Sequence, residues 1–295
     1  MSTTADTDVM EGYRIMKTRV LSGLAMAPLL ILVALGGHFV TGFALVIALM
    51  GVREFFNGFK SMDIKPSYPI AVISIVIIFG IDVLRFNISP TKQFIWEIDW
   101  TTAYVFWAFL SVLLSLLYLF KINERKIEDG MATITGIMYV GFFAHHVVLT
   151  EWHLGRLPGA SPVWLIFITA FGSDIFAYFG GYLFGKHKLC PAISPKKTVE
   201  GAISGVVCTI VLTVLFAHFF LKGDINVFLY VLVGLTGSIV SMFGDLTASI
   251  FKRKMGIKDY GTLIPGHGGV LDRVDSVLFT APMVYYSMLF IHWIS

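Results

Sequence analysis

Nine long apolar stretches run along this 295-residue chain and leave room for little except membrane helices. A helix that crosses the hydrocarbon core of a bilayer needs about 20 residues, and most of the nine stretches meet this length. The chain is 56% hydrophobic and 14% charged, whereas a soluble domain carries roughly 25% charged residues. The sequence therefore predicts an all-α polytopic membrane protein. The stretches cover residues 20–37, 40–52, 69–84, 101–120, 131–149, 162–184, 201–221, 226–248 and 276–294.

The distribution of basic residues predicts the orientation of these segments. If all nine cross the membrane and the N-terminus is cytoplasmic, 18 of the 22 lysines and arginines fall in cytoplasmic segments. Only Arg85, Lys92, Arg156 and Lys222 are then left outside. Lys and Arg concentrate in the cytoplasmic loops of membrane proteins. We therefore expect the N-terminus to be inside and the C-terminus outside.

No linker or change of composition divides the chain, so we expect a single integral membrane domain over residues 1–295. Residues 1–160 hold the first five expected helices and are assigned to packing and interfaces. Residues 161–295 hold helices six to nine and the polar cytoplasmic loops. The two cysteines, Cys190 and Cys208, lack the spacing of a metal or disulfide motif.

Two aspartates lie inside apolar stretches, where a carboxylate is costly. Asp174 and Asp245 would each cost about 2.5–3.5 kcal/mol at the centre of a membrane helix, so a functional role is the first hypothesis. Asp245 belongs to a polar stripe on one helical face, which predicts a helix that lines a wet cavity. An ion pair with a neighbouring helix is the alternative. For Asp174, a cavity role and a hydrogen bond between helices both remain open. The stripe consists of Ser238, Ser241, Asp245, Ser249 and Lys252.

The loop after the sixth stretch is rich in lysine, and its two prolines indicate a shaped loop. A substrate-binding role is one interpretation; attraction to anionic lipid is the other. Thr198 and Glu200 resemble residues that cap the helix that follows. The lysines of this loop are Lys186, Lys188, Lys196 and Lys197.

The segment KDYGTLIPGHGGVLDRVD, residues 258–275, is unusually polar for so apolar a chain. Its glycines let backbone N–H groups approach an anion closely. The cluster also includes bases, which suit phosphates, and carboxylates, which suit a cation. Mg²⁺ takes one or two protein carboxylates and completes its shell with phosphate oxygens and water, so the pattern predicts a Mg²⁺–nucleotide site. The charged members are Asp245, Lys252, Arg253, Lys258, Asp259, Asp272, Arg273 and Asp275.

Several of these polar motifs occur together in one known family. They are SIFKR at 249–253, KD at 258–259, PGHGG at 265–269, LDRVD at 271–275, SPKKTVEG at 194–201 and KTRVLSG at 17–23. With them the chain resembles the phosphatidate cytidylyltransferases, the CDP-diacylglycerol synthases. It departs from many members at Ala248, where they carry a glutamate. Any role of that carboxylate is therefore in doubt here.

The resemblance implies that CTP and phosphatidate react to give CDP-diacylglycerol and pyrophosphate, in phospholipid biosynthesis. It implies Mg²⁺ held by Asp245 and Asp272, and whether a second cation joins it is left open. The other expected site residues fall into two groups. Those expected to be catalytic are Lys252, Arg253, Lys258, His267, Arg273 and Asp275, the five bases among them steadying the phosphates; those expected to bind substrate are Asp174, Lys196, Lys197, Ser249, Gly268 and Gly269.

Two other classes of protein compete with this interpretation. One is a different CTP-dependent lipid enzyme, such as a polyprenol kinase or an ether-lipid cytidylyltransferase. The other is an ion-coupled transporter, which is less favoured because transporters often consist of two similar halves, whereas the polar residues here crowd into the last helices. We expect a bacterial inner membrane, an active site facing the cytoplasm, contact with membrane lipid and no nucleic-acid partner. The oligomeric state is left open, with a homodimer as one alternative.

Overall fold

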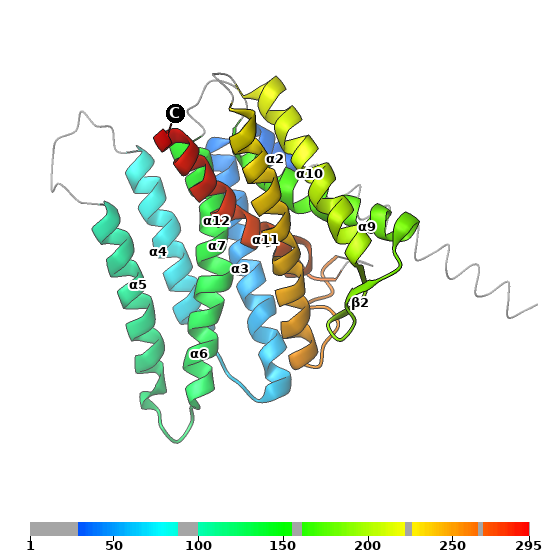
Figure 1. Ribbon diagram of the computed structural model, residues 1–295. Helices are drawn as coiled ribbons and strands as arrows, with labels where there is room; N and C mark the ends of the chain where they lie inside the picture. Colours follow the sequence, from blue (N-terminus) through cyan, green and yellow to red (C-terminus); the bar gives the residue numbers. More distant parts are fainter. Residues whose placement is uncertain (1–28, 88–99, 155–160, 222–225, 265–267, 295) are drawn as a thin grey trace, which may run out of the picture.

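The computed structural model describes residues 29–87, 100–154, 161–221, 226–264 and 268–294 (Figure 1). Within these residues, eight helices are long and apolar enough to cross a membrane, which confirms the all-α polytopic class. Most of the first apolar stretch, 20–37, lies outside the described residues, so the ninth span stays a prediction. The spans cover Gly37–Met62, Tyr68–Arg85, Trp100–Phe120, Ile127–Leu154, Val163–Phe184, Val199–Phe220, Val227–Lys254 and Leu271–Ile291.

The spans are built from α-helices, short 3₁₀ turns and π-helical turns. The α-helices are α2 (Leu29–Leu35), α3 (Gly37–Gly58), α4 (Tyr68–Asn87), α5 (Trp100–Leu117), α6 (Ile127–Gly136), α7 (Phe143–Leu149), α8 (Val163–Phe167), α9 (Ser173–Phe184), α10 (Val199–Phe220), α11 (Val227–Lys254) and α12 (Leu271–Ile294). The 3₁₀ turns are η1 (Phe59–Met62) and η2 (Tyr118–Phe120). The π-helical turns are η3 (Ile137–Phe142), η4 (Thr150–Leu154) and η5 (Ile168–Gly172).

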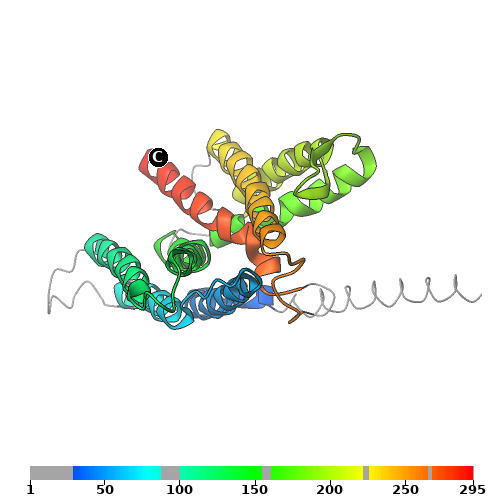
Figure 2. The same cartoon turned by 90° about the horizontal axis from the view of Figure 1, so that it is seen from below.

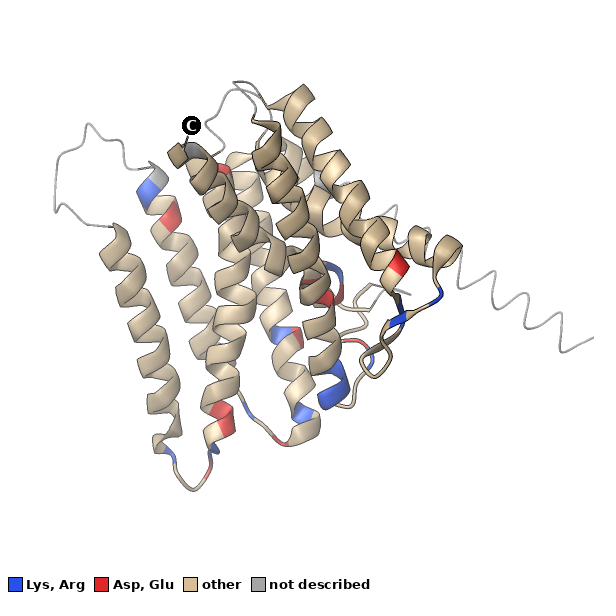
Figure 3. Cartoon of the chain, in the orientation of Figure 1, with Lys and Arg blue, Asp and Glu red and all other residues tan. Residues whose placement is uncertain are grey.

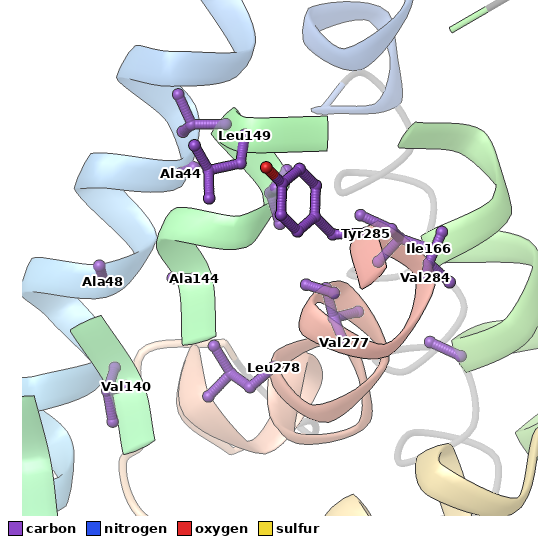
Figure 4. Close-up of a cluster of buried hydrophobic side chains, with 14 of the residues drawn as sticks. Ala44, Ala48, Val140, Ala144, Leu149, Ile166, Val277, Leu278, Val284 and Tyr285 are labelled. Carbon is purple, nitrogen blue, oxygen red and sulfur yellow. The ribbon is translucent and has the colours of Figure 1, made fainter. Parts of the chain in front are cut away.

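The chain runs up and down, and its helices form two groups. Seen from below, helices from the first half of the chain form a row, and those from the second half fan out from it (Figure 2). The core lies where α3, α7 and α12 meet (Figure 4). Small side chains on α3 and α7 let these helices approach α12 closely. The core includes Ala44, Ala48, Val140, Ala144, Val277 and Leu278.

Two helices differ from the apolar stretches that predict them. α3 with η1 extends ten residues beyond the stretch 40–52, through the polar residues Arg53 and Glu54. α12 begins at Leu271, five residues before the stretch that starts at 276. The two extensions meet, because Glu54 accepts hydrogen bonds from the backbone N–H groups of Val270 and Leu271 at the start of α12.

The π-helical turn η5 interrupts the span Val163–Phe184 just before Asp174. A π turn inserts one residue into a helix and leaves carbonyl groups without regular partners. Here a hydroxyl group from α11 is the hydrogen-bond partner of one such carbonyl group. Ser241 Oγ donates to the carbonyl oxygen of Ala170 at 3.3 Å. Ser241 is therefore buried against η5 and does not line a cavity, which corrects one position of the predicted stripe.

The lysine-rich loop folds into an antiparallel hairpin of β1 (Lys188–Cys190) and β2 (Ser194–Thr198). Thr198 ends the second strand and caps α10, because its Oγ1 accepts a hydrogen bond from the Gly201 N–H at 3.1 Å. The predicted cap is thus confirmed. The hairpin is held against α10 and is placed beside α9 and α11 (Figure 1).

A buried polar group joins α4, α5 and α7 on the other side of the molecule. Asp82 is fully buried and accepts a hydrogen bond from the Tyr104 hydroxyl at 2.5 Å. Its second carboxylate oxygen lies 2.8 Å from Nε2 of His145, which is also buried. One carboxylate on α4 thereby contacts polar side chains of both α5 and α7.

Candidate active site

A cavity of about 1380 Å³ opens between α3, α9, α11, α12 and the β hairpin. One part of its lining is apolar and comes from α3, α7, η5 and α9. The other part is charged and lies where the hairpin meets α11 and α12. The charged residues that line it are Asp174, Lys196, Lys197, Asp245, Asp272, Arg273 and Asp275. Sequence motifs more than 100 residues apart are thus brought to one cavity.

Asp245 is positioned on α11 and faces both the cavity and the hairpin. Its Oδ2 forms an ion pair with Nζ of Lys197, which β2 carries to this point. Both side chains are about a quarter exposed, at 28% for Asp245 and 25% for Lys197. The two interpretations of Asp245 are therefore compatible, since it lines a cavity and also pairs with a basic residue.

Asp174 is exposed to the cavity near the start of α9. Its Oδ2 accepts a hydrogen bond from Ser276 Oγ on α12 at 3.0 Å. For this residue, too, the cavity role and the hydrogen bond between helices are both present. The carboxylate of Asp174 lies within electrostatic range of Asp245, Lys197 and Arg273.

Asp275 lies one turn into α12 and is 6% exposed. Its Oδ1 accepts the backbone N–H of Ser276 at 2.8 Å. Its carboxylate is within electrostatic range of Asp174, Asp245 and Lys252. Carboxylates from α9, α11 and α12 thus lie within electrostatic range of one another, and nearby positive charge favours their ionised form.

Asp272 has both carboxylate oxygens engaged by the protein. Oδ1 accepts Lys252 Nζ at 2.7 Å, and Oδ2 accepts the N–H groups of Tyr260 and Gly269 at 2.8 and 3.0 Å. The side chain therefore shapes the glycine-rich segment before α12. Gly268 has a φ of +86°, and a Cβ on it would lie 2.8 Å from Asp272 Oδ2, so the turn requires glycine here.

Tyr260 completes this corner of the site. Burial raises the pKa of its hydroxyl, and the negative charges of Asp272 and Asp275 raise that pKa further. The hydroxyl therefore stays protonated and donates to the carbonyl oxygen of Ala248 at 3.3 Å. Ala248 is fully buried at the position where the chain departs from the family pattern.

Glu54 belongs to the site although no sequence motif singled it out. Its Oε1 accepts the N–H of Val270 at 3.0 Å, and its Oε2 accepts the N–H of Leu271 at 2.8 Å. A carboxylate at the N-terminus of a helix satisfies free N–H groups and complements the helix dipole. The signal that could have revealed it is an acidic residue followed by apolar ones in a membrane span.

The structure does not bring all predicted residues to the cavity. Arg253 and Lys258 are exposed and do not line it, and Ser249 is half-buried outside its lining. Lys252 reaches the site through Asp272. His267 lies outside the described residues.

The donor set fits a magnesium ion that arrives with a nucleotide. Among the described residues, no three His, Cys, Asp or Glu side chains form a ready-made metal site. Mg²⁺ needs only one or two protein carboxylates when phosphates and water supply its other ligands. Asp245 lines the cavity and already pairs with one cationic group, the ammonium of Lys197.

Proteins of one family resemble this chain over most of its length. The model of the cytidylyltransferase family matches residues 17–291. A relative from Staphylococcus haemolyticus named phosphatidate cytidylyltransferase is 33% identical over 273 residues, which cover 91% of this chain and 97% of the relative. A relative of the same name from Staphylococcus aureus is 32% identical with the same coverage. One from Haemophilus influenzae, also of that name, is 44% identical over 129 residues, covering 43% of this chain and 45% of the relative.

Proposed function

Since the chain belongs to the cytidylyltransferase family, we propose that it transfers the cytidylyl group of CTP to phosphatidate and releases CDP-diacylglycerol and pyrophosphate. Family membership makes it a nucleotidyltransferase. The relatives that match nearly its whole length are named for this reaction. Phospholipid biosynthesis is the process that such a reaction serves.

The observation that carries the proposal is the two-sided lining of the cavity. A phosphatidate molecule has an anionic headgroup and apolar chains, and the cavity has a charged part beside an apolar part. The apolar lining includes Phe43, Ile47 and Met50 on α3. A soluble substrate alone would not need this apolar extension, whereas a lipid would.

The reaction requires two polyanions to meet. A phosphate oxygen of phosphatidate attacks the α-phosphorus of CTP, and the bond between that phosphorus and the bridging oxygen breaks, so that pyrophosphate leaves with the electron pair. A phosphomonoester has a second pKa near 6 and is largely dianionic at neutral pH, so no strong base is needed. The barrier lies in positioning and charge repulsion.

The bases of the site meet this requirement. Arg273 lines the cavity without an ion-pair partner among the described residues, and Lys196 belongs to the same lining. Lys197 is within reach to exchange Asp245 for a substrate phosphate. We assign phosphate binding to these three cations.

We propose that Asp245 and Asp272 hold Mg²⁺, with Asp174 and Asp275 near enough to adjust the charge around it. Bound there, the ion would neutralise the phosphates and stabilise the charge that develops on the leaving group. For Asp272 to contribute an oxygen, Lys252 must give up its ion pair, and it would then be free to contact a phosphate.

The chain is an integral membrane protein, and we propose that the site faces the cytoplasm of a bacterial cell at its inner membrane. Most Lys and Arg lie at the end of the bundle that carries the α5–α6 turn and the hairpin (Figure 3). That distribution supports the orientation because basic residues concentrate on the cytoplasmic side. The charged part of the cavity opens toward this end, where soluble CTP would enter.

The test uses the purified full-length chain in detergent with CTP, phosphatidate and Mg²⁺. We expect a CDP-lipid and pyrophosphate, identified by product mass. A phosphorylated lipid together with CDP would identify a CTP-dependent kinase, and transfer to an ether lipid but not to phosphatidate would identify the other lipid enzyme. Ion flux in vesicles without any nucleotide chemistry would support a transporter.

A further inference from the structure

Tyr139 is a polar residue placed deep in the core, beside the charged end of the cavity. It lies in the π-helical turn η3 and is 6% exposed. Its ring packs against Phe55 on α3 and Phe251 on α11, with ring centroids 5.4 and 5.8 Å away. Phe279 on α12 lies 5.8 Å from it as well. The ring is thus fixed by three helices that form the site.

The hydroxyl of Tyr139 is buried and has no hydrogen-bond partner among the described residues. Buried hydroxyls normally find a partner, and each exception calls for an explanation. A phenylalanine would fill the same space without this cost. The tyrosine is therefore a poor choice for packing alone.

The groups around the Tyr139 hydroxyl are mostly carboxylates of the candidate active site. The carboxylates of Asp245, Asp272 and Asp275 and the hydroxyl of Tyr260 all lie within electrostatic range of it. The three aspartates line the cavity, whereas Tyr139 does not. The Tyr139 hydroxyl therefore lies within electrostatic range of the three aspartates without lining the cavity itself.

The π turn adds a second, independent observation. Because a π turn inserts one residue, the side chains on it point in directions that a regular α-helix would not give them. π turns occur frequently at functional sites. In this span the turn carries Tyr139 toward α11 and α12, as the contacts with Phe251 and Phe279 show.

We propose that Tyr139 is a positioning residue whose hydroxyl donates a hydrogen bond to the aspartate cluster when substrate is bound. The inference rests on the proposed function. Lysines now neutralise Asp245 and Asp272, and these carboxylates turn when the lysines move to substrate phosphates. A donor fixed in the core then holds a carboxylate in the orientation that Mg²⁺ and the nucleotide require.

The test is Tyr139→Phe, which removes one hydroxyl and keeps the ring. Without ligand we expect a Tm equal to that of the wild type or higher, because an unpartnered buried hydroxyl is lost. With Mg²⁺ and CTP we expect a smaller rise in Tm than in the wild type. We expect kcat to fall roughly ten- to hundredfold, as for a lost hydrogen bond to a charged group, with little change in KM for phosphatidate.

Tyr230→Phe is the matched control. Tyr230 lies near the other end of α11, is 7% exposed and does not line the cavity. The same chemical change there should alter neither kcat nor the rise in Tm with Mg²⁺ and CTP.

Two results would overturn the inference. One is Tyr139→Phe with wild-type kcat and a wild-type rise in Tm with Mg²⁺ and CTP. The other is a marked loss of Tm without ligand, which would show that the hydroxyl supports the fold. If the wild type binds Mg²⁺ and CTP but transfers no cytidylyl group, the proposed function fails, and the change in the Tm rise still tests the role of Tyr139.

Discussion

Asp272 carries out two tasks with one side chain. Its oxygens accept two backbone N–H groups and the ammonium of Lys252, and so they shape the segment from Tyr260 to Gly269. The same carboxylate lines the cavity. The loop geometry and the charge of the site are therefore linked at a single residue.

Asp272→Asn tests this link. The amide of asparagine has the same volume as the carboxylate but no charge. Its NH₂ group would also face at least one of the three donors, which are Lys252 Nζ and the N–H groups of Tyr260 and Gly269. We therefore expect turnover to fall at least a hundredfold, which is the scale of a lost charge-stabilising group. A Mg²⁺ titration of cytidylyl transfer measures the effect. A folded variant with near wild-type turnover would refute the metal role of Asp272.

The control is Asp63→Asn, in the α3–α4 connection. Asp63 is exposed and has a φ of +51°, a conformation that asparagine adopts readily. Lys126 lowers the pKa of its carboxyl by hydrogen bonding and by charge, but exposed ion pairs contribute little to stability. Turnover and Tm should stay unchanged.

Asp245→Asn tests a different part of the site. This change removes the charge that holds Lys197 and, in the proposal, one ligand of Mg²⁺. We expect cytidylyl transfer to need a higher Mg²⁺ concentration for half-maximal rate, by roughly tenfold or more. A titration curve that matches that of the wild type would count against Asp245 as a ligand.

At the scale of elements, the start of α12 depends on a residue from another helix. Glu54 on α3 satisfies two N–H groups at the first turn of α12, the turn that carries Asp272 and Arg273. The glycine segment and α12 are therefore oriented by α3. Through Glu54, the first half of the chain also helps to shape the site, in addition to the packing and interface role that the sequence predicts for residues 1–160.

Glu54→Ala should therefore affect both stability and activity. Loss of two hydrogen bonds to a charged acceptor should lower the free energy of unfolding by about 2 kcal/mol or more. It should also reduce kcat, because Asp272 and Arg273 lose their fixed placement. Glu54→Gln keeps one acceptor oxygen, so its losses of unfolding free energy and of kcat should be smaller than those of Glu54→Ala. Tm and steady-state kinetics measure these effects.

The matched control is Glu128→Ala at the exposed first turn of α6. It removes a glutamate from a helix end away from the cavity lining. We expect changes within about 0.5 kcal/mol and unaltered kinetics. Equal losses in Glu54→Ala and Glu128→Ala would contradict the specific role of Glu54.

At the scale of the whole molecule, α4 and α5, which do not line the cavity, are joined to α7 by Asp82, His145 and Tyr104. A buried carboxylate and the polar groups around it stabilise a fold only while all of them are present, since each is costly to leave unpaired.

Asp82→Ala should destabilise the molecule by about 3–5 kcal/mol, because the buried His145 loses the carboxylate beside its Nε2 and the half-buried Tyr104 hydroxyl loses its acceptor. The double variant Asp82→Ala with His145→Ala should lose less than the two single losses added together, which a double-mutant cycle measures. Simple additivity would refute the coupling. The kcat of the folded protein should stay unchanged, because the group lies outside the cavity lining.

The amino-acid sequence by itself determined the class of the protein and its family, and it predicts the alternation of its loops. Apolar length and the placement of bases are local properties, and motifs such as LDRVD are read directly from the chain. It also identified all seven charged residues that line the cavity, the carboxylates among them because they are rare in membrane spans.

Only the tertiary structure decided which of these residues meet and what each contacts. It placed Asp174, Asp245 and Asp275 together, paired Lys197 with Asp245, and brought Glu54 to the start of α12. The physical reason is that these contacts depend on how helices pack and where π turns shift their faces, as at Tyr139. Residues far apart in the chain meet through such packing, and no local pattern records it.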